Sequence, residues 1–157
     1  MNILVISDTH GNVNRALLAC ERTKQIDLIL HAGDGSAEAD LLRSALEIPV
    51  INVAGNCDPD SGAPREYFWH CEGKRFLMTH GDAYQVKSGL ARLRQRGHEL
   101  GADGVFYGHT HVAHYENSSG MILLNPGTLA NHATYRSYAL VIVTAEEILC
   151  HHYEIID

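Results

Sequence analysis

The first half of the chain alternates uninterrupted apolar runs with segments whose apolar residues recur at helical spacing. Residues 3–6, 28–30 and 49–53 contain no charged side chain, which is typical of strands that are buried on both faces. After the first run, the apolar residues follow the i, i+3, i+4, i+7 spacing of an amphipathic helix, at Val13, Ala16, Leu17 and Cys20. This order of strands and helices predicts a parallel sheet with right-handed crossovers.

Two further helices are expected. The second lies between residues 28–30 and 49–53, where Ser36 offers an N-cap. Its inward positions are expected to be Ala37, Leu41, Leu42 and Ala45. The third is marked by Val86, Leu90 and Leu93 and is expected to end near Gly97 and Gly101.

The second half of the chain is richer in predicted strands. Residues 67–72 and 75–79 read as a hairpin around Gly73-Lys74. Further strands are expected at residues 105–107, 112–116, 121–124, 138–143 and 148–156. Three helices and about ten strands predict an α/β fold, a four-layer α/β/β/α sandwich of two mixed β-sheets flanked by helices. We expect a single domain over residues 1–157.

Composition narrows the function classes. Twelve Lys and Arg against nineteen Asp and Glu give a net charge of −7, so a nucleic-acid partner is not expected, because such proteins need a basic surface. The apolar run at residues 3–6 is too short for a signal-peptide core, and no stretch approaches the ~20 apolar residues of a membrane span. Four scattered cysteines do not form a disulfide framework or a thiolate zinc site. We therefore expect a reduced, cytoplasmic protein without a membrane partner.

Metal-ligating residue types follow five of the predicted strands directly. The segments are Asp8-Thr9-His10, Gly33-Asp34, Gly55-Asn56, Thr79-His80-Gly81 and Gly108-His109-Thr110-His111. Ligands bind at the carboxyl edge of open α/β sheets, where these loops converge. The segments supply two carboxylates, one amide and four imidazoles, and gathering such groups without a shared cation would be costly. The sequence therefore predicts a metal site.

The number of donors favours two metal ions over one. A mononuclear zinc site uses three or four protein ligands, whereas seven candidates are present here. A carboxylate such as Asp34 can bridge two divalent ions ~3.5–4 Å apart, the arrangement that many phosphoester hydrolases use. Mixed nitrogen and oxygen donors without thiolate suit Mn, Fe, Zn, Co or Ni.

The five segments, in this order, resemble the motifs of the calcineurin-like metallophosphoesterases, and the chain is most similar to the small YfcE-type phosphodiesterases. The resemblance extends from residue 3 to residue 128 and includes Asn125-Pro126-Gly127-Thr128. It implies hydrolysis of small phosphoesters, most of all phosphodiesters, through a hydroxide that bridges two divalent ions, with manganese the first choice. One ion would be held by Asp8, His10, Asp34 and His111. The other would be held by Asp34, Asn56, His80 and His109, and the phosphate would be bound by Asn56 and His109.

The chain departs from the family pattern at two positions. Cys57 stands where most of the family has a His that protonates the leaving group. A thiol is a weak hydrogen-bond donor, so we expect esters with good leaving groups to be cleaved far better than alkyl esters. Cys57 is assigned either this weak catalytic role or that of an inert buried thiol. Asp82 follows Thr79-His80-Gly81, where YfcE-type proteins often have His, and it either orients a metal ligand or is solvated.

The remaining histidines are interpreted as core or surface residues. They are His31, His70, His98, His151 and His152, and His114 joins them because it falls within a predicted strand. His132 is left open, because the loop after Asn125-Pro126-Gly127-Thr128 is in a position to lie over the metals.

A second function class is an interaction scaffold that resembles the retromer small subunit, which has the same fold without the full ligand set. The complete set of seven donors in this chain favours the enzyme. Exposed apolar strand faces such as Tyr67-Phe68-Trp69 would allow a homo-oligomer.

Overall fold

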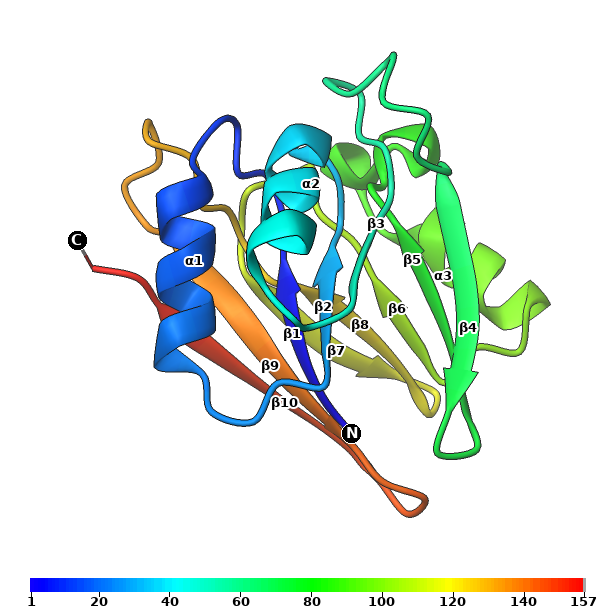
Figure 1. Ribbon diagram of the computed structural model, residues 1–157. Coiled ribbons are helices and arrows are strands. Elements are labelled where there is room, and N and C mark those ends of the chain that lie inside the picture. The colour runs from blue at the N-terminus through cyan, green and yellow to red at the C-terminus, as the bar shows by residue number, and fades with distance from the viewer. Residues whose placement is uncertain (157) are drawn as a thin grey trace.

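A computed structural model describes residues 1–156 as two packed β-sheets with helices on their outer faces (Figure 1). The first sheet contains β1 (Asn2–Ile6), β2 (Leu28–His31), β3 (Val50–Asn52), β9 (Ser137–Val143) and β10 (Ile148–Glu154). Its order is β10-β9-β1-β2-β3. β1, β2 and β3 are parallel, as the sequence predicts, whereas β9 is antiparallel to both β1 and β10.

The second sheet is also mixed and has the order β4-β5-β6-β8-β7. Its strands are β4 (Glu66–Cys71), β5 (Lys74–Thr79), β6 (Gly104–Phe106), β7 (His114–Ser118) and β8 (Met121–Asn125). β5, β6 and β8 are parallel, and the two edge strands form antiparallel hairpins with their neighbours. The predicted hairpin of residues 67–79 is therefore confirmed, with its turn at Glu72-Gly73, one residue earlier than expected.

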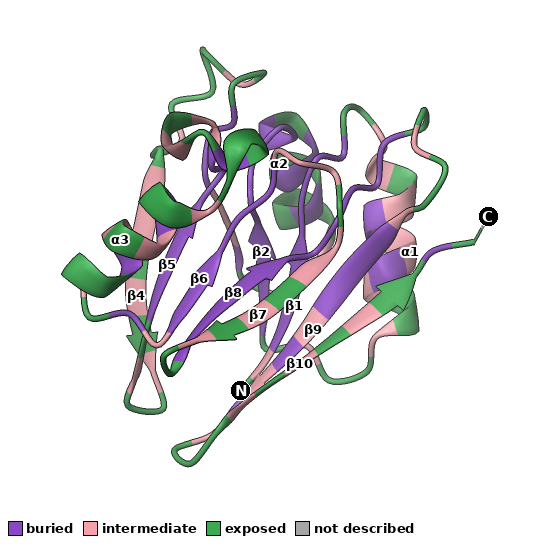
Figure 2. Ribbon diagram, turned by 180° about the vertical axis from the view of Figure 1, so that it is seen from behind, coloured by how far each residue is buried: buried purple, intermediate pink, exposed green. Residues whose placement is uncertain are grey.

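Helices α1 (Val13–Arg22) and α2 (Ser36–Ala45) cover the first sheet, and α3 (Ala91–Glu99) covers the second. The alternation of side chains along β1 shows how the layers form. Ile3 and Val5 pack between the two sheets, whereas Leu4 and Ile6 pack under α1 and α2. Figure 2 shows β6 and β8 buried along their length, with α3 exposing only its outer face. The predicted α/β/β/α sandwich is confirmed.

The buried face of α2 differs from the prediction. The helix begins at Ser36 with Gly35 at its N-cap, and its buried residues are Ser36, Glu38, Ala39 and Leu42. Of the four positions expected to point inward, only Leu42 does so, and Ala37, Leu41 and Ala45 are exposed. Two of the buried residues are polar, so their burial depends on hydrogen bonds to loops that apolar periodicity does not report.

The third helix begins later than predicted. Short 3-10 turns occupy Asp82–Tyr84 and Val86–Ser88, and the left-handed backbone of Gln85 (φ 53°) ends the first turn. Gly97 lies inside α3 rather than at its end. A Cβ there would come within 2.5 Å of the Met121 sulfur, so this glycine allows α3 to pack closely on the second sheet.

Two expectations concern surfaces. Tyr67 and Trp69 are partly buried against the inter-sheet core, and Phe68 is exposed. The expected exposed face of this strand is therefore limited mainly to Phe68, and subunit pairing stays a prediction. Among the helices of residues 1–156, none combines the length and hydropathy that crossing a bilayer requires.

Candidate metal centre

The loops that follow β1, β2, β3, β5 and β6 meet at one end of the two sheets (Figure 1). The first three strands are parallel within one sheet, and the last two are parallel within the other. Because all five carboxyl ends point the same way, the predicted metal-ligating segments converge between the sheets. The structure brings all seven predicted donor residues together in two adjoining groups.

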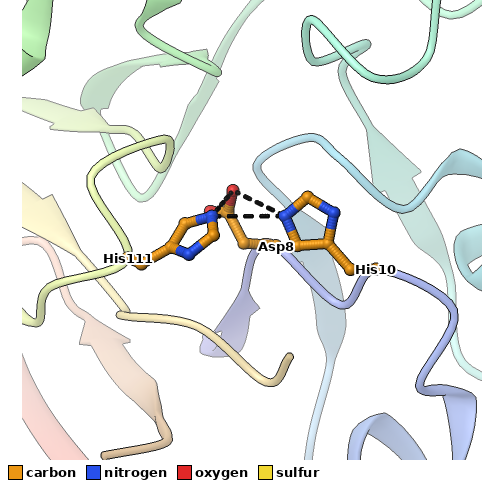
Figure 3. A group of neighbouring side chains, drawn as sticks. All are labelled: Asp8, His10 and His111. Carbon is orange, nitrogen blue, oxygen red and sulfur yellow. Dashed lines mark hydrogen bonds and ion pairs between the residues drawn. The ribbon is translucent and has the colours of Figure 1, made fainter. Parts of the chain in front are cut away.

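The first group consists of Asp8, His10 and His111 (Figure 3). The Asp8 Oδ1 atom lies 3.1 Å from His111 Nε2 and 3.7 Å from His10 Nε2. The two imidazole Nε2 atoms are themselves 3.2 Å apart. One atom from each residue, all within 4.8 Å of one another, can therefore converge on one point.

The second group consists of Asp34, His80 and His109, with Asn56 beside them. His80 Nε2 is its centre, at 3.2 Å from Asp34 Oδ2, 3.2 Å from His109 Nδ1 and 3.1 Å from Asn56 Oδ1. Asp34 Oδ2 also lies 3.8 Å from His10 Nε2 of the first group. The carboxylate of Asp34 thus stands between the two groups.

The buried carboxylate of Asp8 supplies the test of whether a cation fits. Its Oδ2 accepts hydrogen bonds from the Ser7 hydroxyl and from the backbone amide of His109. Its Oδ1 is fully buried and has no hydrogen-bond partner within residues 1–156. An unpaired buried carboxylate oxygen is costly unless a cation neutralises it. Oxygen and imidazole donors around that atom fit a divalent metal ion.

The pKa values of the second group also favour a bound cation. Burial opposes the charged form of Asp34, but hydrogen bonds from His80 and from the Cys57 amide hold the pKa of Asp34 far below its usual range. Burial also opposes the protonated form of His80, yet Asp34 and Asp8 raise the pKa of that imidazole. Burial and the neighbouring His80 lower the pKa of His109. The two carboxylates therefore create a negative potential that a proton on His80 partly offsets and that a cation offsets better.

Backbone strain is concentrated in the donor loops. Five of the seven donor residues have positive φ angles, namely Asp8 (52°), His10 (44°), Asp34 (56°), His109 (68°) and His111 (61°). Such conformations cost of order 1–3 kcal/mol each in residues other than glycine and persist where the surrounding structure imposes them. Gly55 shows how close the packing is, because a Cβ there would lie 1.9 Å from Asp34 Oδ1.

Two supporting arrangements were not predicted. The Asp58 carboxylate accepts hydrogen bonds from the amides of Asp34 (2.8 Å), Gly35 (3.3 Å), Ser36 (3.1 Å) and Gly55 (2.9 Å). It thereby joins the loop after β2 to the loop after β3. Its position two residues after Asn56 is the only hint of this role in the sequence.

The second arrangement lies beneath the donors and is centred on His31, which is fully buried. His31 Nε2 lies 3.0 Å from Thr9 Oγ1, and the amide of Gly33 donates to His31 Nδ1 at 3.3 Å. The Thr9 hydroxyl in turn donates to the buried carboxylate of Glu38 at 2.8 Å. Burial lowers the pKa of His31 to about 4. This histidine has hydrogen-bond partners, as expected, and it ties together the loops that carry Asp8 and Asp34.

The residues with open roles have the following positions. Cys57 is exposed, so the expected buried thiol is wrong. Desolvation and the carboxylate of Asp34 raise the pKa of the Cys57 thiol, which lies within 4.8 Å of donor atoms of His10 and Asp34. Asp82 pairs with Arg65, whose guanidinium also donates to backbone carbonyls of the loop after β3.

The two histidines that follow His111 have different surroundings. His114 lies against the Tyr107 hydroxyl (2.9 Å) and Glu116 rather than the donor groups, as expected for a strand residue. The ring of His132 lies beside the first group, with its centroid 6.0 Å from that of His10 and 5.7 Å from that of His111.

Fold and donor geometry together define a metallophosphoesterase class of protein, and comparison with known proteins agrees. Residues 1–147 match the calcineurin-like phosphoesterase superfamily domain. The chain is 34% identical over 147 residues to the probable metallophosphoesterase YsnB of Bacillus subtilis, an alignment that covers 93% of this chain and 85% of that protein. The chain therefore belongs to the calcineurin-like phosphoesterase superfamily.

Solved structures with lower identity share the fold. An archaeal phosphodiesterase superposes with a TM-score of 0.78 at 20% identity, covering 98% of this chain and 100% of that one. Zinc-bound Vps29 of Entamoeba histolytica superposes with a TM-score of 0.78 at 23% identity, covering 98% of this chain and 99% of that one.

Proposed function

We propose that the protein is a two-metal phosphodiesterase, with residues 1–157 acting as one domain. The observation that supports this best is the pair of adjoining donor groups, with the Asp34 carboxylate between them and the buried Asp8 Oδ1 left without a hydrogen bond among residues 1–156. In this proposal Asp8, His10 and His111 hold one ion together with Asp34. Asp34, Asn56, His80 and His109 hold the other.

When bound, two divalent ions supply positive charge that polarises a phosphoester and makes hydroxide available near neutral pH. The chain's own residues prepare the site for them. The hydrogen bond between His80 Nδ1 and the Ala32 carbonyl, 2.8 Å long, orients Nε2 toward Asp34. Asn56 and His109, which are more exposed than His80, are assigned to contact the phosphate.

The substrate class follows from the surroundings of the donors. Small phosphodiesters are favoured over nucleic acids, because the chain has a net charge of −7. Arg94 and Arg96 of α3 pair with Glu116 and Glu66, so neither forms part of a free basic surface. The exposed thiol of Cys57 is a weak proton donor, which favours diesters with good leaving groups.

Manganese is the first ion to test, and nickel, cobalt, iron, zinc and magnesium complete the series. Metal-free protein would be reloaded with each ion and assayed with a bis-nitrophenyl diester and a nitrophenyl monoester. We expect metal near two equivalents and faster cleavage of the diester. In Asp34→Ala, turnover is expected to be lost with the fold retained. Asp40→Ala, which removes an exposed carboxylate of α2, serves as the matched control.

The alternative is an interaction scaffold of the same fold. Bound metal by itself does not separate an enzyme from a scaffold, so turnover is the deciding measurement. A metal-loaded protein that cleaves neither ester, or undiminished turnover in Asp34→Ala, would reject the hydrolase proposal.

A further inference from the structure

The loop that follows β8 is held against the candidate metal centre. Within it, the Thr128 hydroxyl and the Leu129 amide both donate to the Asp8 carbonyl, at 2.8 Å and 3.3 Å. Leu129 and Ala130 are fully buried. This part of the loop is therefore fixed relative to the backbone of a candidate metal ligand.

Ala130 and Asn131 are held by hydrogen bonds from the start of α1 and from the start of β9. The Asn131 amide oxygen accepts hydrogen bonds from Asn12 at 2.9 Å and from Arg15 at 2.8 Å. The guanidinium of Arg136 donates to the carbonyls of Ala130 at 3.1 Å and Asn131 at 2.9 Å. Side chains from the start of α1 and from the start of β9 thus determine where residue 132 lies.

At that position His132 has an exposed imidazole beside the first donor group. Its centroid is 5.7 Å from that of His111 and 6.0 Å from that of His10. Among the described residues, it does not join the groups whose donor atoms lie within 4.8 Å of one another. Its side chain is exposed, and its two ring contacts within residues 1–156 are with the donor histidines themselves. It therefore stands next to the metal-ligand set without completing it.

We propose that His132 is a substrate-binding residue, whose ring N–H donates a hydrogen bond to a non-bridging phosphoryl oxygen at the first metal position. This rests on the proposed function. A neutral imidazole carries one N–H donor, so donation does not require a change of protonation. A hydrogen bond to a charged oxygen is among the stronger ones that a protein makes. The hydrogen bonds that fix residues 128–131 support this role, because a hydrogen-bond donor adds more to phosphate affinity when it is already held in position.

The test measures binding of inorganic phosphate to the manganese-loaded protein by calorimetry, which needs no turnover. His132→Ala is expected to keep the metal content and thermal stability of the wild type and to bind phosphate about tenfold more weakly. His132→Gln keeps an N–H donor on a side chain of similar length and is expected to recover most of the affinity. His98→Ala, which removes an exposed histidine of α3, is the matched control and is expected to match the wild type.

Three results would each overturn the proposal. They are unchanged phosphate affinity in His132→Ala, loss of metal in that variant, which would make His132 a ligand, and a His132→Gln variant as weak as the alanine. The readout is independent of hydrolysis. A protein that binds phosphate through His132 but cleaves no ester contradicts the proposed function alone. One that cleaves diesters equally well without His132, with unchanged phosphate affinity, contradicts only this inference.

Discussion

The Asp58 carboxylate accepts a hydrogen bond from the backbone amide of Asp34 at 2.8 Å, so one acidic residue fixes the loop that presents another. The same carboxylate accepts hydrogen bonds from three further backbone amides, including that of Gly55 at 2.9 Å. Those hydrogen bonds hold the pKa of Asp58 below its usual range despite partial burial. Asp58 is thus a positioning residue for the centre.

Replacing Asp58 by Asn is expected to destabilise the protein by roughly 1–3 kcal/mol, because an amide nitrogen then faces backbone amides that need an acceptor. Metal affinity should fall with it, since the loop that carries Asp34 is no longer fixed. Urea unfolding and metal titration measure the two effects. Asp60→Asn, an exposed residue of the same loop, is the control, and equal behaviour of the two variants would contradict the assigned role.

Metal binding is expected to stabilise the folded chain. Within residues 1–156 the buried Asp8 Oδ1 accepts no hydrogen bond, and a ligand that binds only the folded state adds about 2.7 kcal/mol at a concentration 100 times its Kd. Thermal unfolding with EDTA and with added manganese should therefore show a higher Tm with the metal. The increase should be much smaller in Asp8→Asn, and an equal increase in both proteins would remove Asp8 from the ligand set.

Gly55→Ala tests the packing around Asp34. The added methyl group would lie 1.9 Å from Asp34 Oδ1, so the carboxylate must move away from its position between the two donor groups. We expect weaker metal binding and reduced turnover. The control is Gly73→Ala, where the methyl group meets no atom within 4 Å and the positive φ of 74° adds backbone strain away from the metal centre, so this variant shows the effect of lost stability alone. Metal content would be measured on both folded variants, and full metal retention in Gly55→Ala would show that the loop relaxes freely.

The neutral His31 imidazole makes the metal-free fold sensitive to acid. Its folded pKa is lowered from 6.5 to about 4, so between these values the unfolded chain binds a proton that the folded chain excludes. The stability contribution is complete above about pH 6.5 and is lost as the pH falls toward 4. His31→Gln should be less stable than wild type near neutral pH but lose less stability over this window. Urea unfolding of both proteins across the window measures the difference, and parallel pH profiles would contradict it.

Cys57→His places a stronger proton donor at the exposed position beside Asp34. General acid catalysis is worth about 10²–10⁴-fold where the leaving group needs a proton. The variant should therefore show a large increase in kcat on alkyl esters and a small one on nitrophenyl esters. A plot of kcat against leaving-group pKa should flatten relative to wild type and to Cys57→Ser. Identical slopes in all three proteins would show that position 57 does not donate the proton.

The fold could be predicted largely because apolar periodicity reports which face of an element is buried. β1 follows that rule. In α1 the predicted Ala16 is fully buried and the other predicted positions, Val13, Leu17 and Cys20, are partly buried, whereas the buried Ala19 was not predicted. The rule fails for α2, where the buried Glu38 is held by a hydrogen bond from Thr9 that originates in another loop. The start of α3 was also beyond prediction, because the left-handed backbone of Gln85 is imposed by tertiary packing.

The seven donor residues could be proposed from the sequence, because each follows a strand and strand ends converge in a sheet of this type. Their supporting residues could not. Asp58 and His31 act through hydrogen bonds to backbone amides. Apart from the position of Asp58 two residues after Asn56, the order of side chains gives no sign of these contacts. The place of His132 depends on how Arg15 and Arg136 hold its loop, which likewise follows only from the folded chain.

The first donor group joins residues that are 103 positions apart, because it pairs Asp8 with His111. During synthesis Asp8 therefore leaves the ribosome well before its imidazole partner has been made. β1 is separated from its neighbouring strand β9 by an even longer stretch of sequence. Products of premature termination before residue 108 have neither His109 nor His111. Such fragments lack one candidate donor from each of the two groups, so neither group can form completely before this part of the chain is made.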